Sequence, residues 1–459
     1  MIEVFEMIHL TFLSQKKTAA LLLACMLGFS SAGCGRQDSA ANGQDSAAAS
    51  HAQGSLSHEG YTLEQVVVLS RHNIRSPLSG GDSLLGQVTP HTWHTWSSAP
   101  SELSLRGGVL ETEMGQFFRV WMEQEGLFPP NYQPDADAVR IYSNSKQRTI
   151  ATARYFSAGL LPAANTEVEY HMEYDKMDPV FTPQLTFLTD DYEQDVREQI
   201  HELFAEKIAG LEDNYKLLAD VIDLEQSPAY KDGSVSALRT DDSEFILKEY
   251  AEPGVSGSLK TACQISDALV LQYYEEPDEK KAAFDHSLSS KDWETISEIK
   301  DLYGDVLFTA PLVAPNVAHP LLEEIRSELD NEDRVFTFLC GHDSNVGSVL
   351  AALQAEDYEA PDAIEKKTPI GCKLVFAEWR GPDGKAYISV DLVYQTTEQL
   401  RSAAMLGQAV SPAVFGISLA GLQKNADGLY QADAVMERLD ASIGEYDSLI
   451  ATYGFENAA

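Results

Sequence analysis

Three short apolar runs, each followed at once by a polar loop and a helical pattern, constrain the fold of this chain more than any other feature. The runs span residues 66–69 (VVVL), 139–142 (VRIY) and 335–340 (VFTFLC). Continuous runs rich in β-branched residues are typical of strands buried on both faces, as in parallel sheets. Ligands of open α/β sheets bind beyond the carboxyl ends of such strands. We therefore expect an α/β fold whose functional residues lie in the three loops.

The middle of the chain has a different pattern. Apolar residues recur at three- and four-residue steps through about 189–300, whereas strand signals such as KLVFAEW and AYISVDLVY lie outside it. This predicts an α/β core formed by 61–188 and 301–459, with a mainly parallel sheet flanked by helices. An α-helical cap domain, 189–300, is inserted into this core. The alternative is that these helices pack as part of a single layer, without a separate cap.

The three loops collect cations, histidines and one carboxylate in a strongly acidic chain. Arg148 falls in the first turn of a helix that Ser143, Asn144 or Ser145 can cap. A cation there opposes the helix macrodipole, which is explained if an anion binds between them. Taken singly, Arg148 also fits a solvent-facing residue. The six candidate site residues are Arg71, His72, Arg75, Arg148, His342 and Asp343.

This set of side chains suits phosphate chemistry. Three arginines, which keep their charge, match a phosphate group through bidentate hydrogen bonds. His72 can act as a nucleophile and Asp343 as a proton donor for a leaving oxygen. Each also has a structural interpretation, since a capping aspartate and a structural histidine are common. We expect no metal site and no cofactor, so the arginines would supply the electrostatic stabilisation.

The charge balance excludes one class of partner. The chain has 459 residues with 33 Lys and Arg against 71 Asp and Glu, a formal net charge of −38. A nucleic-acid binder normally has a basic surface, so we expect no nucleic-acid partner. No run of about 20 apolar residues occurs, so we expect no transmembrane helix.

The N-terminal segment has the pattern of an export signal. Two lysines precede the apolar stretch TAALLLACMLGFSSAGC, which predicts a signal peptide over 1–33. Residues 31–34 (SAGC) resemble a bacterial lipobox, which implies cleavage before Cys34 and lipidation of its thiol. The alternative is an ordinary secretory signal. Residues 34–60, rich in Ser, Ala and Gly, predict a flexible tether. We expect an exported protein, periplasmic or lipid-anchored in the cell envelope.

Three cysteines follow the tether. The spacing of Cys263, Cys340 and Cys372 fits no zinc motif. Because an exported protein can form disulfides, Cys340 and Cys372 are one possible pair, since both lie by predicted strands. Buried free thiols are the favoured interpretation.

Several segments resemble a known family. Residues 71–77 (RHNIRSP) resemble the RHxxRxP signature of the histidine acid phosphatases, branch 2 of the histidine phosphatase superfamily. His342-Asp343 resembles the second motif of that family, and 142–156 (YSNSKQRTIATARYF) resembles the segment that supplies a further arginine. The resemblance extends from about residue 66 to the C-terminal region, through stretches such as EPGVSGSLK, LQYYEE and KTPIGCKLVF. It is greatest for the periplasmic members that hydrolyse glucose-1-phosphate.

The resemblance implies a reaction and a role for each candidate residue. The reaction is hydrolysis of phosphomonoesters, glucose-1-phosphate or similar sugar phosphates, without a metal and through a phosphohistidine on His72. Asp343 protonates the departing oxygen, and because an unperturbed Asp has a pKa of about 3.9, this predicts an acidic optimum. The phosphoryl oxygens are held by Arg71, Arg75, Arg148 and His342.

The substrate is the part of this prediction with the most alternatives. By the resemblance, Glu275 contacts the sugar, although a solvated carboxylate at a helix end fits equally. A phytase or a broad-specificity acid phosphatase is the alternative within enzymes. A lipid-tethered protein that binds phosphate esters without turnover is the remote alternative, against which the presence of His72 and Asp343 argues.

Overall fold

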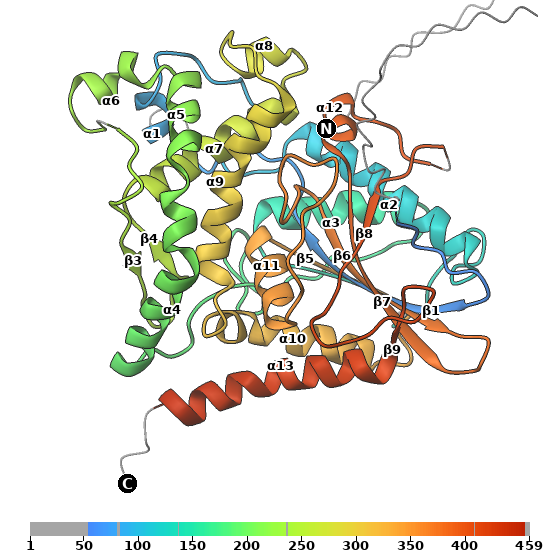
Figure 1. Ribbon diagram of the computed structural model, residues 1–459. Coiled ribbons are helices and arrows are strands. Elements are labelled where there is room, and N and C mark those ends of the chain that lie inside the picture. The colour runs from blue at the N-terminus through green and yellow to red at the C-terminus, as the bar shows by residue number, and fades with distance from the viewer. Residues whose placement is uncertain (1–53, 80–82, 136, 236, 408, 455–459) are drawn as a thin grey trace, which may run out of the picture. The chain divides into compact units, whose positions relative to one another are not determined.

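A seven-stranded sheet forms the core, in the order β2-β5-β1-β6-β7-β8, with β9 paired to β7 (Figure 1). The computed structural model describes residues 54–79, 83–135, 137–235, 237–407 and 409–454. The strands of this sheet are β1 (Thr62–Arg71), β2 (Val139–Ser143), β5 (Phe336–Gly341), β6 (Lys373–Arg380), β7 (Ala386–Tyr394), β8 (Ala413–Gly416) and β9 (Tyr430–Gln431).

The strands that were expected from the three apolar runs lie side by side and run in one direction. β5 pairs in parallel with β1 on one side and with β2 on the other. β6 is antiparallel to β1 and to β7. The connection from β6 to β7, residues 381–385, is too short for a crossover and therefore makes a hairpin. The α/β class is confirmed, and the parallel part of this mixed sheet is the part that ends at the candidate loops.

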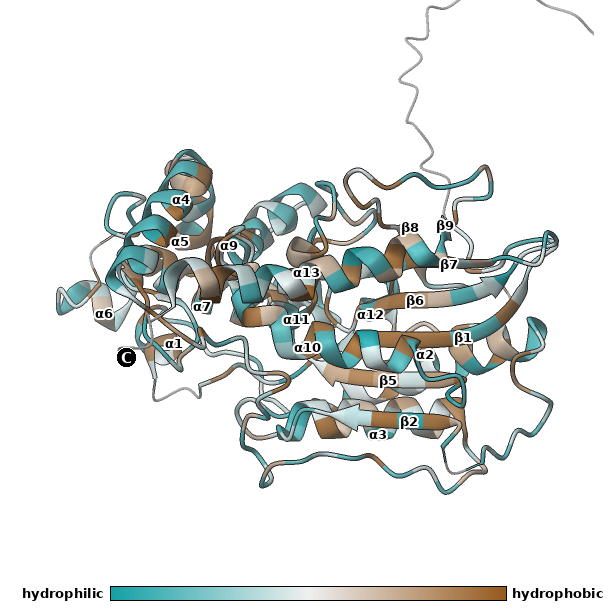
Figure 2. Cartoon of the chain, turned by 90° about the horizontal axis from the view of Figure 1, so that it is seen from below, coloured by the Kyte–Doolittle hydropathy of each residue, from teal (hydrophilic) through white to brown (hydrophobic). Residues whose placement is uncertain are grey.

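Helices cover both faces of the sheet. Along β1, Val66 and Val68 pack into one apolar cluster with α2 and α3, while Val67 and Leu69 pack into another with α10, α11 and α13. The apolar colouring of β1 and β5 in Figure 2 reflects this burial on both faces. The covering helices are α2 (Leu105–Gln124), α3 (Gln147–Leu160), α10 (Ala314–Leu329), α11 (Asp343–Ala352) and α13 (Ala432–Tyr453).

Helices α2 and α3 cross in close contact because each has a glycine at the crossing. A Cβ atom on Gly115 would lie 2.1 Å from the Phe156 carbonyl oxygen, and a Cβ on Gly159 would lie 2.1 Å from that of Thr112. Real Cβ atoms do not approach a backbone oxygen so closely. The two glycines therefore set the distance between the helix that supports the first loop and the helix that carries Arg148.

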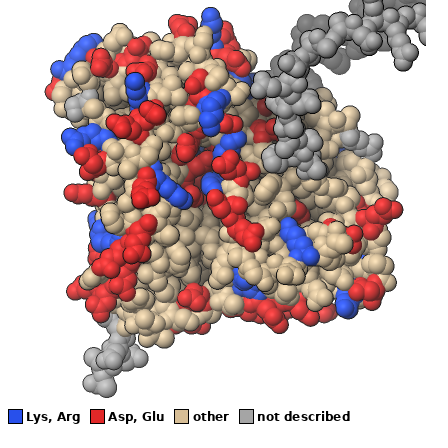
Figure 3. Space-filling model, in the orientation of Figure 1, with Lys and Arg blue, Asp and Glu red and all other residues tan. Residues whose placement is uncertain are grey.

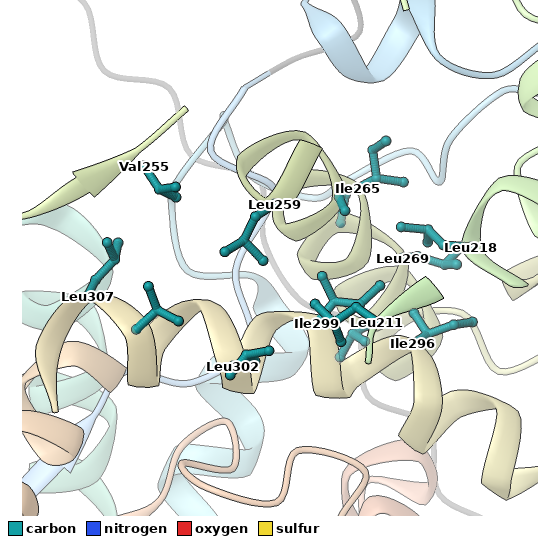
Figure 4. Packing of buried hydrophobic residues seen from close by; sticks show 14 of the residues in the cluster. Leu211, Leu218, Val255, Leu259, Ile265, Leu269, Ile296, Ile299, Leu302 and Leu307 are labelled. Atoms are coloured by element: carbon teal, nitrogen blue, oxygen red, sulfur yellow. The ribbon is translucent and has the colours of Figure 1, made fainter. Parts of the chain in front are cut away.

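A helical bundle adjoins the sheet. Leu259, Ile265 and Leu269 of α7 belong to one apolar cluster with Ile296 and Ile299 of α9, and the cluster continues through α4 and α5 (Figure 4). The bundle lies inside the predicted 189–300 segment except for the end of α9. Its main helices are α4 (Asp190–Ala209), α5 (Glu212–Val221), α7 (Ser258–Glu275) and α9 (Ser290–Phe308). The division into an α/β core and an inserted domain stays a prediction.

Short elements complete the connections. They are α1 (Leu84–Gln87), η1 (Leu224–Gln226), α6 (Pro228–Lys231), β3 (Phe245–Ile246), β4 (Gly254–Val255), α8 (Glu279–Ala282) and α12 (Thr397–Ser402). β3 and β4 pair with each other in a separate two-stranded sheet. No helix of the described residues is long and apolar enough to cross a membrane. The predicted signal peptide, Cys34 and tether residues 34–53 lie outside the described residues.

The three cysteines are buried free thiols, as favoured above. The alternative pairing of Cys340 with Cys372 is wrong. Cys340 is on β5 and pairs with Ser70 of β1, and the Cys372 carbonyl accepts from Arg71 N–H on the other side of β1. Because strands are about 4.8 Å apart, thiols on either side of a strand are too distant for the roughly 5.5–6 Å Cα separation of a disulfide.

Candidate active site

The carboxyl ends of β1, β5 and β2 bring the three predicted loops together at one edge of the sheet. His72 N–H donates to the Gly341 carbonyl at 3.0 Å, and Asn144 N–H donates to the Cys340 carbonyl at 2.9 Å. Arg148 is in the first turn of α3, and Asp343 is the first residue of α11. The predicted convergence of the three strand ends is therefore confirmed.

A cavity of about 830 Å³ opens at this edge. Arg71 lies behind the cavity wall, with 1 % of its side chain exposed, and its Nη2 is 3.5 Å from Asp343 Oδ2. The structure thus brings all six candidate residues into one place, five of them on the wall itself. Those five are His72, Arg75, Arg148, His342 and Asp343.

His72 is held as a neutral imidazole with one nitrogen free. Its Nδ1 lies 2.8 Å from the Asn73 carbonyl oxygen, an acceptor only, so Nδ1 donates the hydrogen. Burial, followed by the charges of Arg148 and Arg75, holds the pKa of His72 well below its usual range. A neutral imidazole with its proton on Nδ1 has a lone pair on Nε2. Nε2 is thereby suited to attack an electrophile.

A fully buried ion pair supports the loop that carries His72. Glu111 of α2 and Lys373 of β6 are 2.8 Å apart, and neither side chain is exposed. Glu111 Oε2 accepts from Asn73 Nδ2 at 2.8 Å, while Lys373 Nζ donates to the Gly371 carbonyl at 2.7 Å. The residue whose carbonyl fixes His72 is therefore itself fixed by α2 and β6.

His342 is also neutral, with its tautomer set by Asn144. The Asp178 backbone N–H donates to Asn144 Oδ1 at 2.9 Å, so the amide nitrogen of Asn144 faces His342 Nε2, 2.7 Å away. Nε2 accepts in this short contact, so the proton is on Nδ1, and the longer approach of Arg148 Nη2 to Nδ1, at 3.5 Å, is one between two donors. Burial and the charge of Arg148 hold the pKa of His342 well below its usual range. His342 can therefore donate from Nδ1 to an anion beside it.

Asn144 was expected to serve a different purpose. The N-cap of α3 is Lys146, without a side-chain cap, so the prediction that residues 143–145 cap this helix is wrong. The Asn144 side chain is used on His342 instead. A polar residue shortly before a helix can either cap that helix or bind a side chain of a neighbouring loop, and the sequence is the same for both roles. Only the position of His342, which follows β5, shows which role Asn144 has.

The arginines differ in how far their charges are already compensated. Arg71 is paired with Glu365 at 2.6 Å, and Arg75 with Asp267 at 3.0 Å. Arg148 has no ion-pair partner within the described residues, and burial together with Arg75 lowers its pKa to about 10. The Nε atoms of all three arginines are buried without a hydrogen-bond acceptor. This excess of unsatisfied positive donors fits an anion such as a phosphate group.

Asp343 is held as a carboxylate by two cations. Its Oδ2 accepts from Lys300 Nζ at 2.6 Å, and its Oδ1 accepts from the Ser344 backbone N–H at 3.0 Å. Burial opposes ionisation, but Lys300 and Arg71 outweigh it and hold the pKa of Asp343 well below its usual range. The side chain is 36 % exposed to the cavity. Asp343 therefore faces the cavity, with Lys300 beside it on the wall and Arg71 behind it.

The structure does not bring Glu275 to this cavity. Glu275 is the last residue of α7, and its Oε2 accepts from Ser104 Oγ at 2.9 Å. The cavity wall includes a different carboxylate, Glu252, from the segment EPGVSGSLK. That segment carried part of the family resemblance, so it was the signal that could have directed attention to Glu252.

Other residues of the site had no signal in the sequence. Lys300 occupies one position of the amphipathic helix α9, and Glu365 lies in a loop before β6. Lys300 neighbours no recognisable motif, and Glu365 lies two residues before the resemblance stretch KTPIGCKLVF without being part of it. Among the described residues, no group of three or more His, Cys, Asp or Glu side chains is arranged to hold a metal ion.

Comparison with known proteins identifies the family. The model of the histidine phosphatase superfamily (branch 2) matches residues 62–395, and the chain belongs to this family. It is a phosphatase, and the family resemblance of the three loops is confirmed. The matched region contains all three loops and the helical bundle.

The relatives and solved structures agree on this family. The chain is 36 % identical to a glucose-1-phosphatase of Salmonella typhimurium, over 83 % of this chain and 92 % of the relative. It is 28 % identical to the phytase AppA of Escherichia coli, over 80 % and 89 %. The solved structure of Hafnia alvei phytase in complex with tartrate superposes with a TM-score of 0.76 at 25 % identity, covering 84 % of this chain and 98 % of that one.

Proposed function

We propose that this chain hydrolyses phosphomonoesters without a metal, with glucose-1-phosphate or a similar sugar phosphate as substrate, through a phosphohistidine intermediate. The observation that carries the proposal is the neutral His72, with Nε2 free, among three arginines with unsatisfied donors. Four of the other five candidate residues line the same cavity wall as His72. The glucose-1-phosphatases among the relatives support the choice of substrate.

In the first step, His72 Nε2 attacks phosphorus while the bond from phosphorus to the ester oxygen breaks. The reactive form is the one in which Asp343 is protonated, which acidic pH favours, and the leaving oxygen takes this proton, so that Asp343 becomes a carboxylate. An alkoxide is a poor leaving group, so a positioned acid contributes roughly 10²–10⁴-fold. Negative charge on the equatorial oxygens is met by donors that are already in place on Arg75, Arg148 and His342. Arg71 lies behind them, and we propose that it completes the phosphate site.

In the second step, water attacks phosphorus and the bond from phosphorus to Nε2 breaks. The Asp343 carboxylate accepts the proton of this water, which restores the starting state. Inorganic phosphate leaves as the product. The free carboxylate form of Asp343, which Lys300 and Arg71 favour, is the form required for this step.

The charge of the cavity wall favours a substrate with one phosphate group. The described wall carries seven acidic and six basic side chains, and Arg75, Lys300 and Lys367 are already paired with carboxylates. A phytate ion has several phosphates and requires an excess of cations. Glu252 presents a carboxylate to this cavity, and we propose that it hydrogen-bonds to sugar hydroxyls. Hydrolysis of phytate is the second candidate function, supported by the phytases among the relatives and solved structures.

We further propose that the protein is exported. Residues 1–33 have the pattern of a signal peptide, and a lipid on Cys34 would attach the enzyme to a membrane through the tether that follows. This attachment needs no transmembrane helix. The substrate that enters the cavity is then a small phosphate ester outside the cytoplasm.

The test compares phosphate release from glucose-1-phosphate and from phytate, using the chain from Gly35 onward and its His72→Ala variant. We expect preference for glucose-1-phosphate and a loss of at least about 10³-fold in the variant. Preference for phytate would keep the mechanism and replace the substrate. Activity that survives in the variant would exclude His72 as the nucleophile, and a folded wild type that binds esters without releasing phosphate would support the binding-protein alternative.

A further inference from the structure

Lys300 reaches the active site from the helical bundle rather than from the sheet. It lies in α9, and its Nζ is 2.6 Å from Asp343 Oδ2 and 3.5 Å from Glu365 Oε1. Its side chain is 11 % exposed. A buried ammonium is costly without partners, so its placement against the proton donor requires an explanation.

Four charged groups alternate in sign at this place. Arg71 also contacts both carboxylates, with Nη1 2.6 Å from Glu365 Oε1 and Nη2 3.5 Å from Asp343 Oδ2. Glu365 therefore contacts both cations, and with the second carboxylate, Asp343, the two positive charges are matched by two negative charges. Of the two cations, Lys300 makes the shorter contact to Asp343. When Asp343 gives up its proton, the carboxylate that forms is already paired with Lys300.

We propose that Lys300 is a positioning residue that orients the Asp343 carboxyl group and sets the pH range in which Asp343 carries the proton that it donates. This inference rests on the proposed function of Asp343. In the first step Lys300 stabilises the carboxylate product of proton transfer, and in the second it holds that carboxylate for the attacking water. The same contact lowers the pH below which Asp343 stays protonated, so a residue of the helical bundle sets the acidity of a carboxyl group at the start of α11, just after β5.

The other groups around Asp343 do not replace this effect. Arg148 from α3 and Arg71 from β1 add positive charge, whereas Glu252 and Glu365 add negative charge. His72 is neutral, as described above. Tyr303, Cys263 and Cys372 are neutral as well, because burial raises their pKa values. Apart from the Ser344 backbone N–H on Oδ1, Lys300 is the hydrogen-bond donor to this carboxylate within the described residues.

The test is the dependence of kcat/KM on pH with glucose-1-phosphate. Loss of the nearby charge in Lys300→Met should move the alkaline limb upward by about 1 pH unit, the lower end of the range for a close opposite charge, because the carboxyl group is partly exposed. Lys300→Arg keeps the charge and should leave the limb in place. Lys291→Met makes the same substitution in the same helix, on an exposed lysine paired with Glu294, and should also leave it in place. Ionisation of the substrate also affects kcat/KM, but equally in all variants, so a difference between their alkaline limbs comes from the enzyme.

A folded Lys300→Met enzyme whose alkaline limb coincides with that of the wild type would overturn the inference. Should that variant not fold, the wild type decides: the carboxyl ¹³C resonance of Asp343, assigned with Asp343→Asn, should titrate below about pH 3.9. Titration at or above that value would equally overturn it. A wild type that releases phosphate from no ester contradicts the proposed function, whereas an active wild type with an unshifted variant contradicts the role of Lys300 alone.

Discussion

Two neutral imidazoles face one cavity, and a single neighbour fixes the tautomer of each. The Asn73 carbonyl takes the Nδ1 hydrogen of His72, and the Asn144 amide donates to Nε2 of His342. The two rings, with centroids 5.5 Å apart, therefore present different groups: a lone pair on one and a hydrogen on the other. One imidazole is suited to attack phosphorus, the other to bind its oxygens.

The buried Glu111–Lys373 pair makes the placement of His72 sensitive to a residue outside the cavity. Lys373→Met leaves the Glu111 carboxylate buried without a counter-charge, and we expect a loss of about 3–5 kcal/mol in the free energy of unfolding at neutral pH. Burial already raises the pKa of Glu111, and loss of Lys373 raises it further. The folded state then binds the proton more tightly than the unfolded state. The loss should therefore be smallest near pH 4 and grow as the pH rises above the unfolded value of about 4.3.

Urea denaturation across this pH range measures the effect. The matched control is the double variant Glu111→Gln/Lys373→Met, which removes both charges and keeps an amide to accept from Asn73. The double variant should recover much of the stability. Its difference from the wild type in the free energy of unfolding should no longer depend on pH as that of the single variant does. A single variant whose loss is the same at all pH values would contradict a charged Glu111.

At the scale of elements, the crossing of α2 and α3 determines where two of the three loops meet. Gly115→Ala places a methyl group against the Phe156 carbonyl, a backbone atom that cannot move aside. Overpacking costs about 3 kcal/mol, and the better helix propensity of Ala returns about 1 kcal/mol, so we expect a net loss of about 2 kcal/mol. Activity should fall as well, since α3 carries Arg148. Thermal unfolding and phosphate release check both expectations.

Gly444 of α13 is the control for this prediction. A Cβ on Gly444 meets nothing within 4 Å, so Gly444→Ala should raise the thermal midpoint through helix propensity alone. If Gly115→Ala and Gly444→Ala changed the thermal midpoint equally, α2 and α3 would be able to move apart without loss of stability.

The elements also show how far the sequence could predict this site. Apolar runs identify the strands, and the direction of parallel strands brings the following loops to one edge, so Arg71, His72 and Asp343 were predictable. Lys300 was not, because it comes from the helical bundle, whose packing against the sheet has no local pattern, and for Glu252 the only signal was the resemblance of the segment EPGVSGSLK. For the same reason the position of Glu275 could not be predicted: it is the last residue of α7, two helical turns beyond Asp267, the α7 residue that contacts Arg75.

At the scale of the whole molecule, the acidic surface contrasts with the cluster of three arginines beside His72. Red acidic side chains outnumber blue basic ones on the face in Figure 3, in agreement with a net charge of −38. The arginines act on a phosphate at contact distance, where screening is weak. The acidic surface acts at longer range, and salt at physiological strength screens it beyond about 8 Å. Raising the ionic strength should therefore weaken the effect of the acidic surface while leaving the contacts of the arginines with phosphate largely unchanged.

Self-repulsion of this surface should make stability depend on salt. At pH 7, raising NaCl from about 0.01 M to about 0.15 M shortens the Debye length from about 30 Å to about 8 Å and should raise the thermal midpoint. Near pH 4.5, the isoelectric point of the sequence, the net charge is close to zero and the same addition should have little effect. Differential scanning calorimetry at both pH values measures this difference. An equal rise at both would indicate a general effect of the salt rather than relief of repulsion between carboxylates.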